Sequence, residues 1–249
     1  MDHKPLSHCC VYIVVMLWYI HSQMYVNPPL GKSVTMARKT KQQALETRNQ
    51  ILDAAIARFS EFGVSATSLA DIAREAGVTR GAIYWHFKNK TDLLNEIWAQ
   101  SESGLEDVEQ EYQSKYPDDP LSVMRAVLCY VFSATARDRR RRSLLEIIFH
   151  KCEFVGEMLP LQIVQQNLYL ECYEKIEEVL AACIKAGQLP ARLNMRRAAI
   201  IMRGYITGIM ENWLFMPESF DIEQDAPVLV DALIEMLKNS PSLLTEAAS

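Results

Sequence analysis

The spacing of apolar residues after Met36 constrains the fold of this chain more than any other feature. Aliphatic and aromatic residues recur there at intervals of three and four, which places them on one face of successive α-helices. No segment keeps the strict alternation of apolar and polar residues that predicts a β-strand. We therefore expect an all-α protein.

Capping signals delimit short helices at the start of this region. The first helix has one apolar face, made by Leu45, Leu52, Ala55, Ile56 and Phe59. Gly63 follows at the position of a left-handed C-terminal cap, and Ser68 with Asp71 predicts the start of a second helix. Gly77 ends that helix, and a third helix of about two turns follows it.

Longer helices are expected further along the chain. Residues 89–92 supply caps for a long fourth helix, after which Pro117 and Pro120 break the pattern. Later helices are expected at residues 121–136, 140–154, 160–187, 194–214 and 225–239. The last two carry more apolar surface than one small bundle hides. This surplus favours packing against the same helices of a second copy, and so a homodimer.

The two short helices joined through Gly77 have the form of a helix-turn-helix. Glycine tolerates the tight corner, and the second helix is short enough to enter the major groove of DNA. Arg80 can make a bidentate contact to guanine, Gly81 lets the backbone come close, and Tyr84 lies one turn on along the same face. A helix, a glycine and a short aromatic helix are also common in all-α cores, and spacing alone leaves that alternative open.

Hydroxyl and basic groups around this element are candidates for phosphate contacts. Side-chain and backbone donors at the N-terminus of the supporting helix can bind phosphate. The candidate DNA-binding residues are Thr67, Ser68, Thr79, Arg80, Gly81, Tyr84, His86 and Lys90. Residues 36–90 hold nine Lys and Arg against five Asp and Glu, although the whole chain has a formal charge of -5. A basic segment on an otherwise acidic chain is expected when that segment meets DNA.

The string TSLADIAREAGVTRGAIYWHFKNKTDLL resembles the TetR family of one-component transcriptional repressors, and the match is strong over residues 45–98. The resemblance implies a DNA-binding domain at residues 36–92, with the helix-turn-helix at 68–87. It implies an all-α ligand-binding and dimerisation domain at residues 93–249. Such proteins bind near-palindromic, double-stranded operator DNA as homodimers and leave it when a ligand binds.

The same resemblance assigns roles to the aromatic end of the third helix. Trp85 becomes a further DNA-binding residue that touches the backbone of the duplex, whereas Ile83 and Phe87 belong to the core. The strings RRSLLEIIFHKCEFVGEM and MENWLF are similar to those of family members that repress multidrug-efflux operons. Those members respond to small lipophilic or cationic drugs and dyes.

A pocket for such ligands needs aromatic walls and at least one acid to offset ligand charge. The resemblance points to Trp98, Glu102, Phe149 and Gln165 as ligand-binding residues. A carboxylate facing an apolar cavity is costly unless it is hydrated or paired, which suits Glu102 to receive a cation. The alternative is that Trp98 is an ordinary core residue and Glu102 a solvated surface acid.

Residues 1–35 do not fit the pattern of the rest of the chain. The apolar run at residues 9–20 is shorter than the roughly 20 residues of a membrane-spanning helix. Its flanks lack the basic start and the small-residue cleavage site of a signal peptide. We interpret this segment as an extension before the natural start at Met36 and expect a cytoplasmic protein without a membrane partner. The alternative is a sensor that uses the run as an anchor.

Other chemistry has little support in the sequence. The six cysteines form no C-x-x-C motif, which indicates reduced thiols, and His150 near Cys152 lacks the further ligands of a metal site. The basic run at residues 139–142 is more typical of a solvated or acid-paired helix start than of a second DNA surface. No nucleophile elbow, phosphate loop or His–carboxylate pair is present, so we expect neither an enzyme nor a cofactor.

Overall fold

The structure is a computed structural model that describes residues 36–101, 105–153 and 159–245. Its described residues form helices joined by short turns and contain no strand beyond an isolated bridge between Leu193 and Leu244. The prediction of an all-α fold is therefore confirmed. The chain divides into two compact units, which we describe separately.

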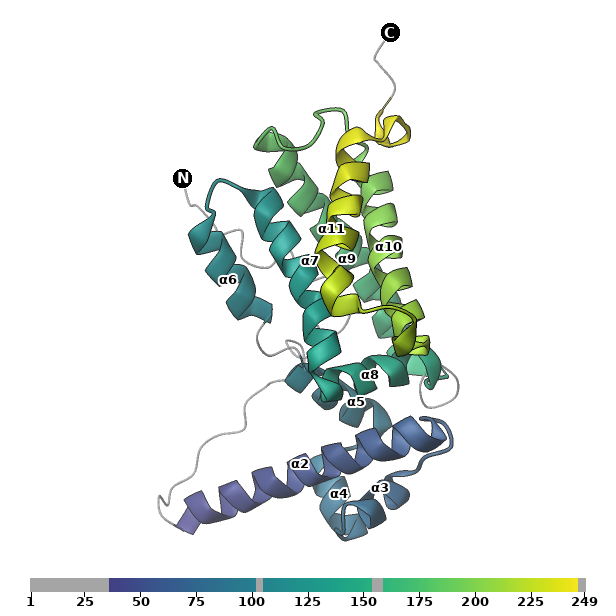
Figure 1. Ribbon diagram of the computed structural model, residues 1–249. Coiled ribbons are helices and arrows are strands. Elements are labelled where there is room, and N and C mark those ends of the chain that lie inside the picture. Colours follow the sequence, from purple (N-terminus) through teal and green to yellow (C-terminus); the bar gives the residue numbers. More distant parts are fainter. Residues whose placement is uncertain (1–35, 102–104, 154–158, 246–249) are drawn as a thin grey trace. The chain divides into compact units, whose positions relative to one another are not determined.

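The first unit holds the predicted helix-turn-helix. Its helices are α2 (Met36–Phe62), α3 (Leu69–Glu75), α4 (Arg80–His86), α5 (Lys90–Ser101) and nearly all of α8 (Arg139–His150). α3 and α4 lie beside the C-terminal half of α2 (Figure 1). Fully buried side chains from these helices form one core, which includes Leu52, Phe59, Ile72, Ile83, Phe87 and Ile97.

The apolar face predicted for α2 is only partly the face that is buried. Leu52, Ala55 and Phe59 are completely inaccessible, but Leu45 is 50% exposed. The reason is visible in Figure 1, where the N-terminal part of α2 extends past α3 and α4 and has nothing to pack against within this unit. Helical spacing identifies the apolar stripe of a helix, but it does not show how much of that stripe neighbouring helices cover.

The second unit is a helical bundle. Its helices are α6 (Leu105–Lys115), α7 (Pro120–Arg137), most of α9 (Leu159–Lys185), α10 (Met195–Phe215) and α11 (Ile222–Asn239), with short 3-10 helices η3 (Pro217–Ser219) and η4 (Pro241–Leu243). Each helix predicted after Pro120 is present, with ends within a few residues of those expected. The long fourth helix is instead described as α5 and α6, on either side of residues 102–104.

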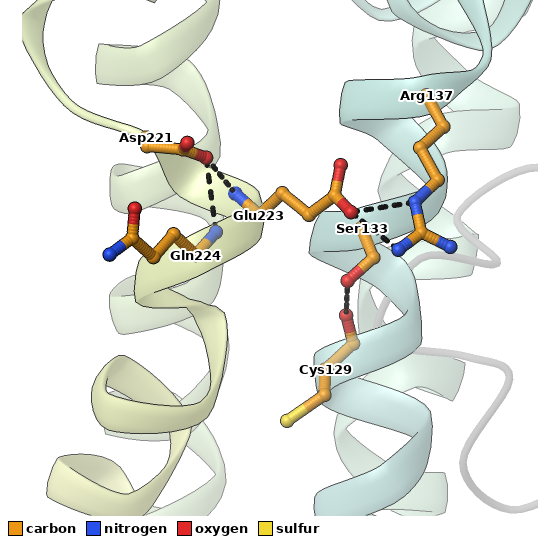
Figure 2. Close-up of polar contacts among 6 residues, drawn as sticks. All are labelled: Cys129, Ser133, Arg137, Asp221, Glu223 and Gln224. Carbon is orange, nitrogen blue, oxygen red and sulfur yellow. Dashed lines mark hydrogen bonds and ion pairs between the residues drawn. The ribbon is translucent and has the colours of Figure 1, made fainter.

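Ion pairs join α7 to α11 inside this bundle. Arg125 Nε and Nη2 donate to the two carboxylate oxygens of Asp231 at 2.5 and 2.7 Å. At the other end of α7, Arg137 Nε donates to Glu223 Oε1 at 2.8 Å, and the backbone N–H of Glu223 donates to the Asp221 carboxylate that caps the start of α11 (Figure 2). Two guanidinium–carboxylate pairs along one helix contact fix how these helices lie against each other.

Candidate DNA-binding surface

The N-terminus of α3 is closed by a capping box, as the sequence predicts. The backbone N–H of Asp71 donates to Ser68 Oγ at 3.2 Å, and the backbone N–H of Ser68 donates to Asp71 Oδ2 at 3.1 Å. Hydrogen bonds from Ser68 hold the pKa of the Asp71 carboxyl below its ordinary value. Because each group satisfies the other, the start of α3 is fixed without help from DNA.

The turn between α3 and α4 depends on one glycine. Gly77 has φ = 67°, in the left-handed region that favours glycine. The N–H of Val78 donates to the carbonyl of Ala73 at 2.9 Å, and the N–H of Gly77 donates to that of Arg74 at 3.2 Å. These bonds terminate α3 and turn the chain directly into α4, so the prediction for Gly77 is confirmed.

α4 begins at a threonine cap and presents its first residues to solvent. Thr79 Oγ1 accepts a hydrogen bond from the N–H of Ala82 at 3.2 Å. Thr79, Arg80 and Gly81 are all exposed. The cap uses an acceptor position of the Thr79 hydroxyl and leaves its proton free to donate. The exposed start of a short helix is the part that reads base edges in helix-turn-helix proteins.

The two faces of α4 have opposite character. Ile83 and Phe87 are 0% and 1% exposed, as expected for core residues, whereas Tyr84 is 52% exposed and Trp85 is 74% exposed. The Trp85 ring lies edge-on to the ring of His86, with centroids 4.5 Å apart. Burial, and then the nearby charge of Arg48, lower the pKa of His86 below its ordinary value of 6.5. The imidazole is therefore neutral at pH 7.

Thr67 does not lie where the sequence analysis placed it. Its side chain is buried, and Oγ1 donates to the carbonyl of Gly63 at 2.8 Å. The hydroxyl is thus used inside the domain, within the turn that leads from α2 to α3. The Thr67 side chain is therefore not available to contact a phosphate.

Lys90 is buried, although the sequence predicted it to contact phosphate at the surface. It is only 5% exposed, and its Nζ donates to the carbonyl of Val64 at 2.8 Å and reaches that of Ser65 at 3.5 Å. An ammonium held by backbone carbonyls inside the domain cannot also contact a phosphate at the surface. The nearby lysine whose side chain is exposed is Lys88.

Sequence reasoning missed Arg48 of α2. Its guanidinium lies 4.9 Å from the centre of the Phe87 ring and forms an ion pair with Glu96 of α5. Arg48 therefore braces the C-terminal end of α4 from the neighbouring helix. No sequence signal links a residue on one helix to an aromatic ring almost forty positions away.

The predicted ligand-binding residues are not brought together by the described part of the structure. Glu102 lies outside the described residues, and so do the side chains of Trp98 and Gln165, whose backbones belong to α5 and α9. Phe149 on α8 is 36% exposed, with its ring 6.2 Å from that of His150. A hollow of about 320 Å³ in the second unit, between Ala136, Trp213 and Phe220, includes none of the four residues.

Four of the six cysteines lie in the described part of the chain. Cys129, Cys152, Cys172 and Cys183 form no disulfide bond there. Burial raises the pKa of Cys152 to about 11 and that of Cys183 to about 12, so both are protonated at neutral pH. Across the described residues, no group of His, Cys, Asp and Glu could hold a metal ion, and none of their helices is long and apolar enough to cross a membrane.

Comparison with known families agrees with this geometry. A family model for bacterial regulatory proteins of the tetR family matches residues 51–97, which include α3 and α4. A second model, for the C-terminal region of MAATS-type transcriptional repressors, matches residues 119–239. The chain belongs to the TetR family. It is a TetR-type transcriptional regulator, and α3 and α4 lie within the residues that the tetR family model matches.

Individual relatives support the assignment along almost the whole protein. This TetR-family chain is 59% identical to the HTH-type transcriptional regulator AcrR of Shigella flexneri, over 86% of the chain and 100% of the relative. Its structure resembles that of NalD, the secondary repressor of the MexAB-OprM multidrug efflux pump in Pseudomonas aeruginosa. The TM-score is 0.70 and the identity 32%, and the match covers 80% of this chain and 99% of NalD.

A further similar structure has a bound ligand. It is the triclosan complex of SmeT, the repressor of the multidrug efflux pump SmeDEF of Stenotrophomonas maltophilia. The TM-score is 0.65 and the identity 29%, and the match covers 82% of this TetR-family chain and 99% of SmeT.

Proposed function

We propose that this protein is a ligand-responsive repressor of a multidrug-efflux operon. It binds a near-palindromic operator as a homodimer and is released by lipophilic or cationic drugs and dyes. The observation that carries the proposal is the exposed start of α4, where Arg80 projects between a threonine cap and two exposed aromatic residues. The regulatory target follows from similarity to repressors of efflux pumps.

We assign DNA contacts to the exposed residues of the candidate set. Arg80 reads guanine and Tyr84, one turn on, lies on the same face, while Gly81 allows close approach of the backbone. Ser68, Thr79, Trp85 and His86 contact the phosphate backbone at either side of the groove. Lys88 replaces Lys90 as the basic contact after α4, because its side chain is exposed.

Exposed apolar residues support a homodimer formed through α10 and α11. Ile200, Phe215 and Val228 are 50%, 80% and 69% exposed, so these apolar side chains are available to a partner surface. A side chain added at Gly204 or Gly208 would meet no atom within 4 Å, so α10 is open to a close neighbour at both positions. A symmetric pair of these helices would bury the exposed groups.

The ligand site is assigned to Trp98, Glu102, Phe149 and Gln165. Support comes from the residue types, since aromatic rings and one acid suit a lipophilic cation. The SmeT complex shows that a similar repressor takes up the small aromatic molecule triclosan. Release requires that the ligand bind more tightly to a dimer whose two recognition helices no longer match the spacing of the half-sites.

Fluorescence anisotropy tests the proposal directly. A labelled duplex would first be selected by the wild-type protein from a randomised pool, so that no operator need be assumed. We expect salt-dependent binding of this duplex, palindromic symmetry in the selected sequence, and release on addition of the cationic dye rhodamine 6G. Absence of any selected sequence would contradict DNA binding, whereas binding without release by the dye would contradict only the ligand class.

A further inference from the structure

The loop between α2 and α3 is held by polar contacts from two other helices of the same unit. Lys90, the first residue of α5, contacts it with its buried ammonium. The carbonyl of Lys151, just after α8, accepts a hydrogen bond from the N–H of Val64 at 3.0 Å. The Lys151 ammonium also donates to the carbonyl of Ser60.

The buried ammonium of Lys90 is satisfied by backbone carbonyls of the loop. Burying an ammonium is unfavourable unless its N–H groups are satisfied, and here the Val64 carbonyl lies at 2.8 Å. The position also opposes the helix dipole of α5, because a positive charge in the first turn of a helix is disfavoured. The nearby C-terminal end of α2 supplies the opposite, favourable field. The lysine is therefore stabilised by the loop and not by its own helix.

The loop itself has little freedom to move away from these partners. Gly63 has φ = 80°, and a β-carbon built on it would lie 3.4 Å from the carbonyl of Lys151. Val64 is fully buried, and Arg140 of α8 pairs with Asp53 of α2 at 3.3 Å. Cys152 is close enough for the charge of Lys90 to lower its thiol pKa, although burial has the larger, opposite effect. The ends of α2, α8 and α5 thus meet at one place.

In the sequence, the α2–α3 loop comes directly before the helix-turn-helix. Three residues separate Val64 from Ser68, the cap of α3, and Thr67 among them is hydrogen-bonded back to Gly63. A change in the loop would move the start of α3 and, through the tight turn at Gly77, the recognition helix. Lys90 is therefore placed to influence DNA recognition without touching DNA.

We propose that Lys90 is a positioning residue for operator recognition, which fixes the α2–α3 loop against the end of α8 and so sets the placement of α3 and α4. The proposal rests on the DNA-binding function above. It differs from a phosphate contact in a measurable way. A phosphate contact adds about 0.9 to the slope of log affinity against log salt for each contact, whereas a buried positioning group adds nothing.

The test compares Lys90→Met and Lys90→Gln with Lys88→Met in the full-length protein, using the duplex selected by the wild type. Lys88 is the matched control because it is an exposed lysine two residues away. We expect Lys90→Met to weaken binding to the selected duplex by about tenfold or more, with an unchanged salt slope. Lys88→Met should lower the slope by about 0.9 for each contact it removes and weaken binding to selected and scrambled duplexes alike.

A rescue variant and a comparison of two duplexes distinguish a positioning role from a general loss of folding. Lys90→Gln keeps N–H donors without the charge, so it should recover part of the affinity that Lys90→Met loses. The Met variant should lose more affinity for the selected duplex than for a scrambled one, and its Val64 amide should exchange hydrogen faster in the absence of DNA. A fall in salt slope for both Lys90 variants, or full affinity in Lys90→Met, would overturn the proposal. Failure of the wild type to select a duplex would instead count against the DNA-binding function.

Discussion

The side chains of α4 fall into a buried group and an exposed group. Ile83 and Phe87 are buried and hold the helix in place, whereas Arg80, Tyr84 and Trp85 are exposed. The backbone N–H groups at the start of the helix are served by the Thr79 cap, so the exposed side chains can change without unfolding it. Substitutions on the two faces should therefore separate affinity from stability.

Replacing Arg80 by alanine should reduce binding to the selected duplex by about 1 to 3 kcal/mol per half-site and relax the base preference at the guanine it contacts. Anisotropy titrations with single-base variants of the duplex measure both effects. Arg74→Ala is the matched control, because Arg74 is an exposed arginine on the neighbouring helix α3 and its loss removes the same charge. Its effect should be equal for all duplexes. An unchanged base preference in Arg80→Ala would remove Arg80 from the base-reading set.

His86 predicts a pH dependence of stability. Because burial lowers its pKa in the folded state, the unfolded chain binds a proton more readily below about pH 6.5. The contribution of His86 to stability is thus complete above that pH and declines as the pH falls through the lowered folded-state pKa. We expect His86→Gln to lose less stability than the wild type between pH 7.5 and 5.5, as measured by urea unfolding. Parallel losses in the two proteins would contradict this.

Helix ends determine how the recognition element is built. The capping box at Ser68, the glycine at position 77 and the Thr79 cap are all local signals, and each was predictable from neighbouring residues. Thr67 and Lys90 were misplaced because their partners depend on the folded loop, and for Lys90 these partners lie 26 and 25 residues away. The brace from Arg48 to Phe87 was missed for the same reason. Local patterns predict where helices begin and end. They do not predict which polar side chains are buried and hydrogen-bonded between helices.

The Ser68 cap allows stability and DNA binding to be changed separately. Ser68→Ala should lower the free energy of unfolding by about 1 kcal/mol, because the N–H of Asp71 loses its acceptor. Ser68→Asp should restore the cap but place a second carboxylate near the phosphates. We therefore expect the Asp variant to unfold like the wild type in urea yet bind the selected duplex more weakly than the Ala variant. Equal DNA affinity for the two variants would show that this end of α3 lies away from the phosphates.

At the scale of the whole molecule, the proposed mode of operator binding depends on a second copy of the chain. The apolar surplus on the last two helices was predictable from composition and spacing, and the structure locates it at exposed positions on α10 and α11. The arrangement of the ligand-binding residues was not predictable from spacing, because they come from helices far apart in the sequence. The ligand site therefore stays a prediction.

Ile200→Arg should disrupt the proposed dimer, because it places a charge at an exposed apolar position of α10. Sedimentation velocity should show a shift from dimer to monomer, accompanied by a loss of operator affinity. Leu45→Arg is the matched control, since Leu45 is also 50% exposed but lies on α2. It should remain dimeric. A dimer in Ile200→Arg would move the interface away from α10.

The ion pairs between α7 and α11 have a mechanical consequence. Because both pairs are exposed to solvent, each adds little to stability. Their geometry matters more, because sliding α7 by one helical turn, about 5.4 Å, would break both pairs at once. We therefore expect α7 and α11 to move together and not to slide along each other.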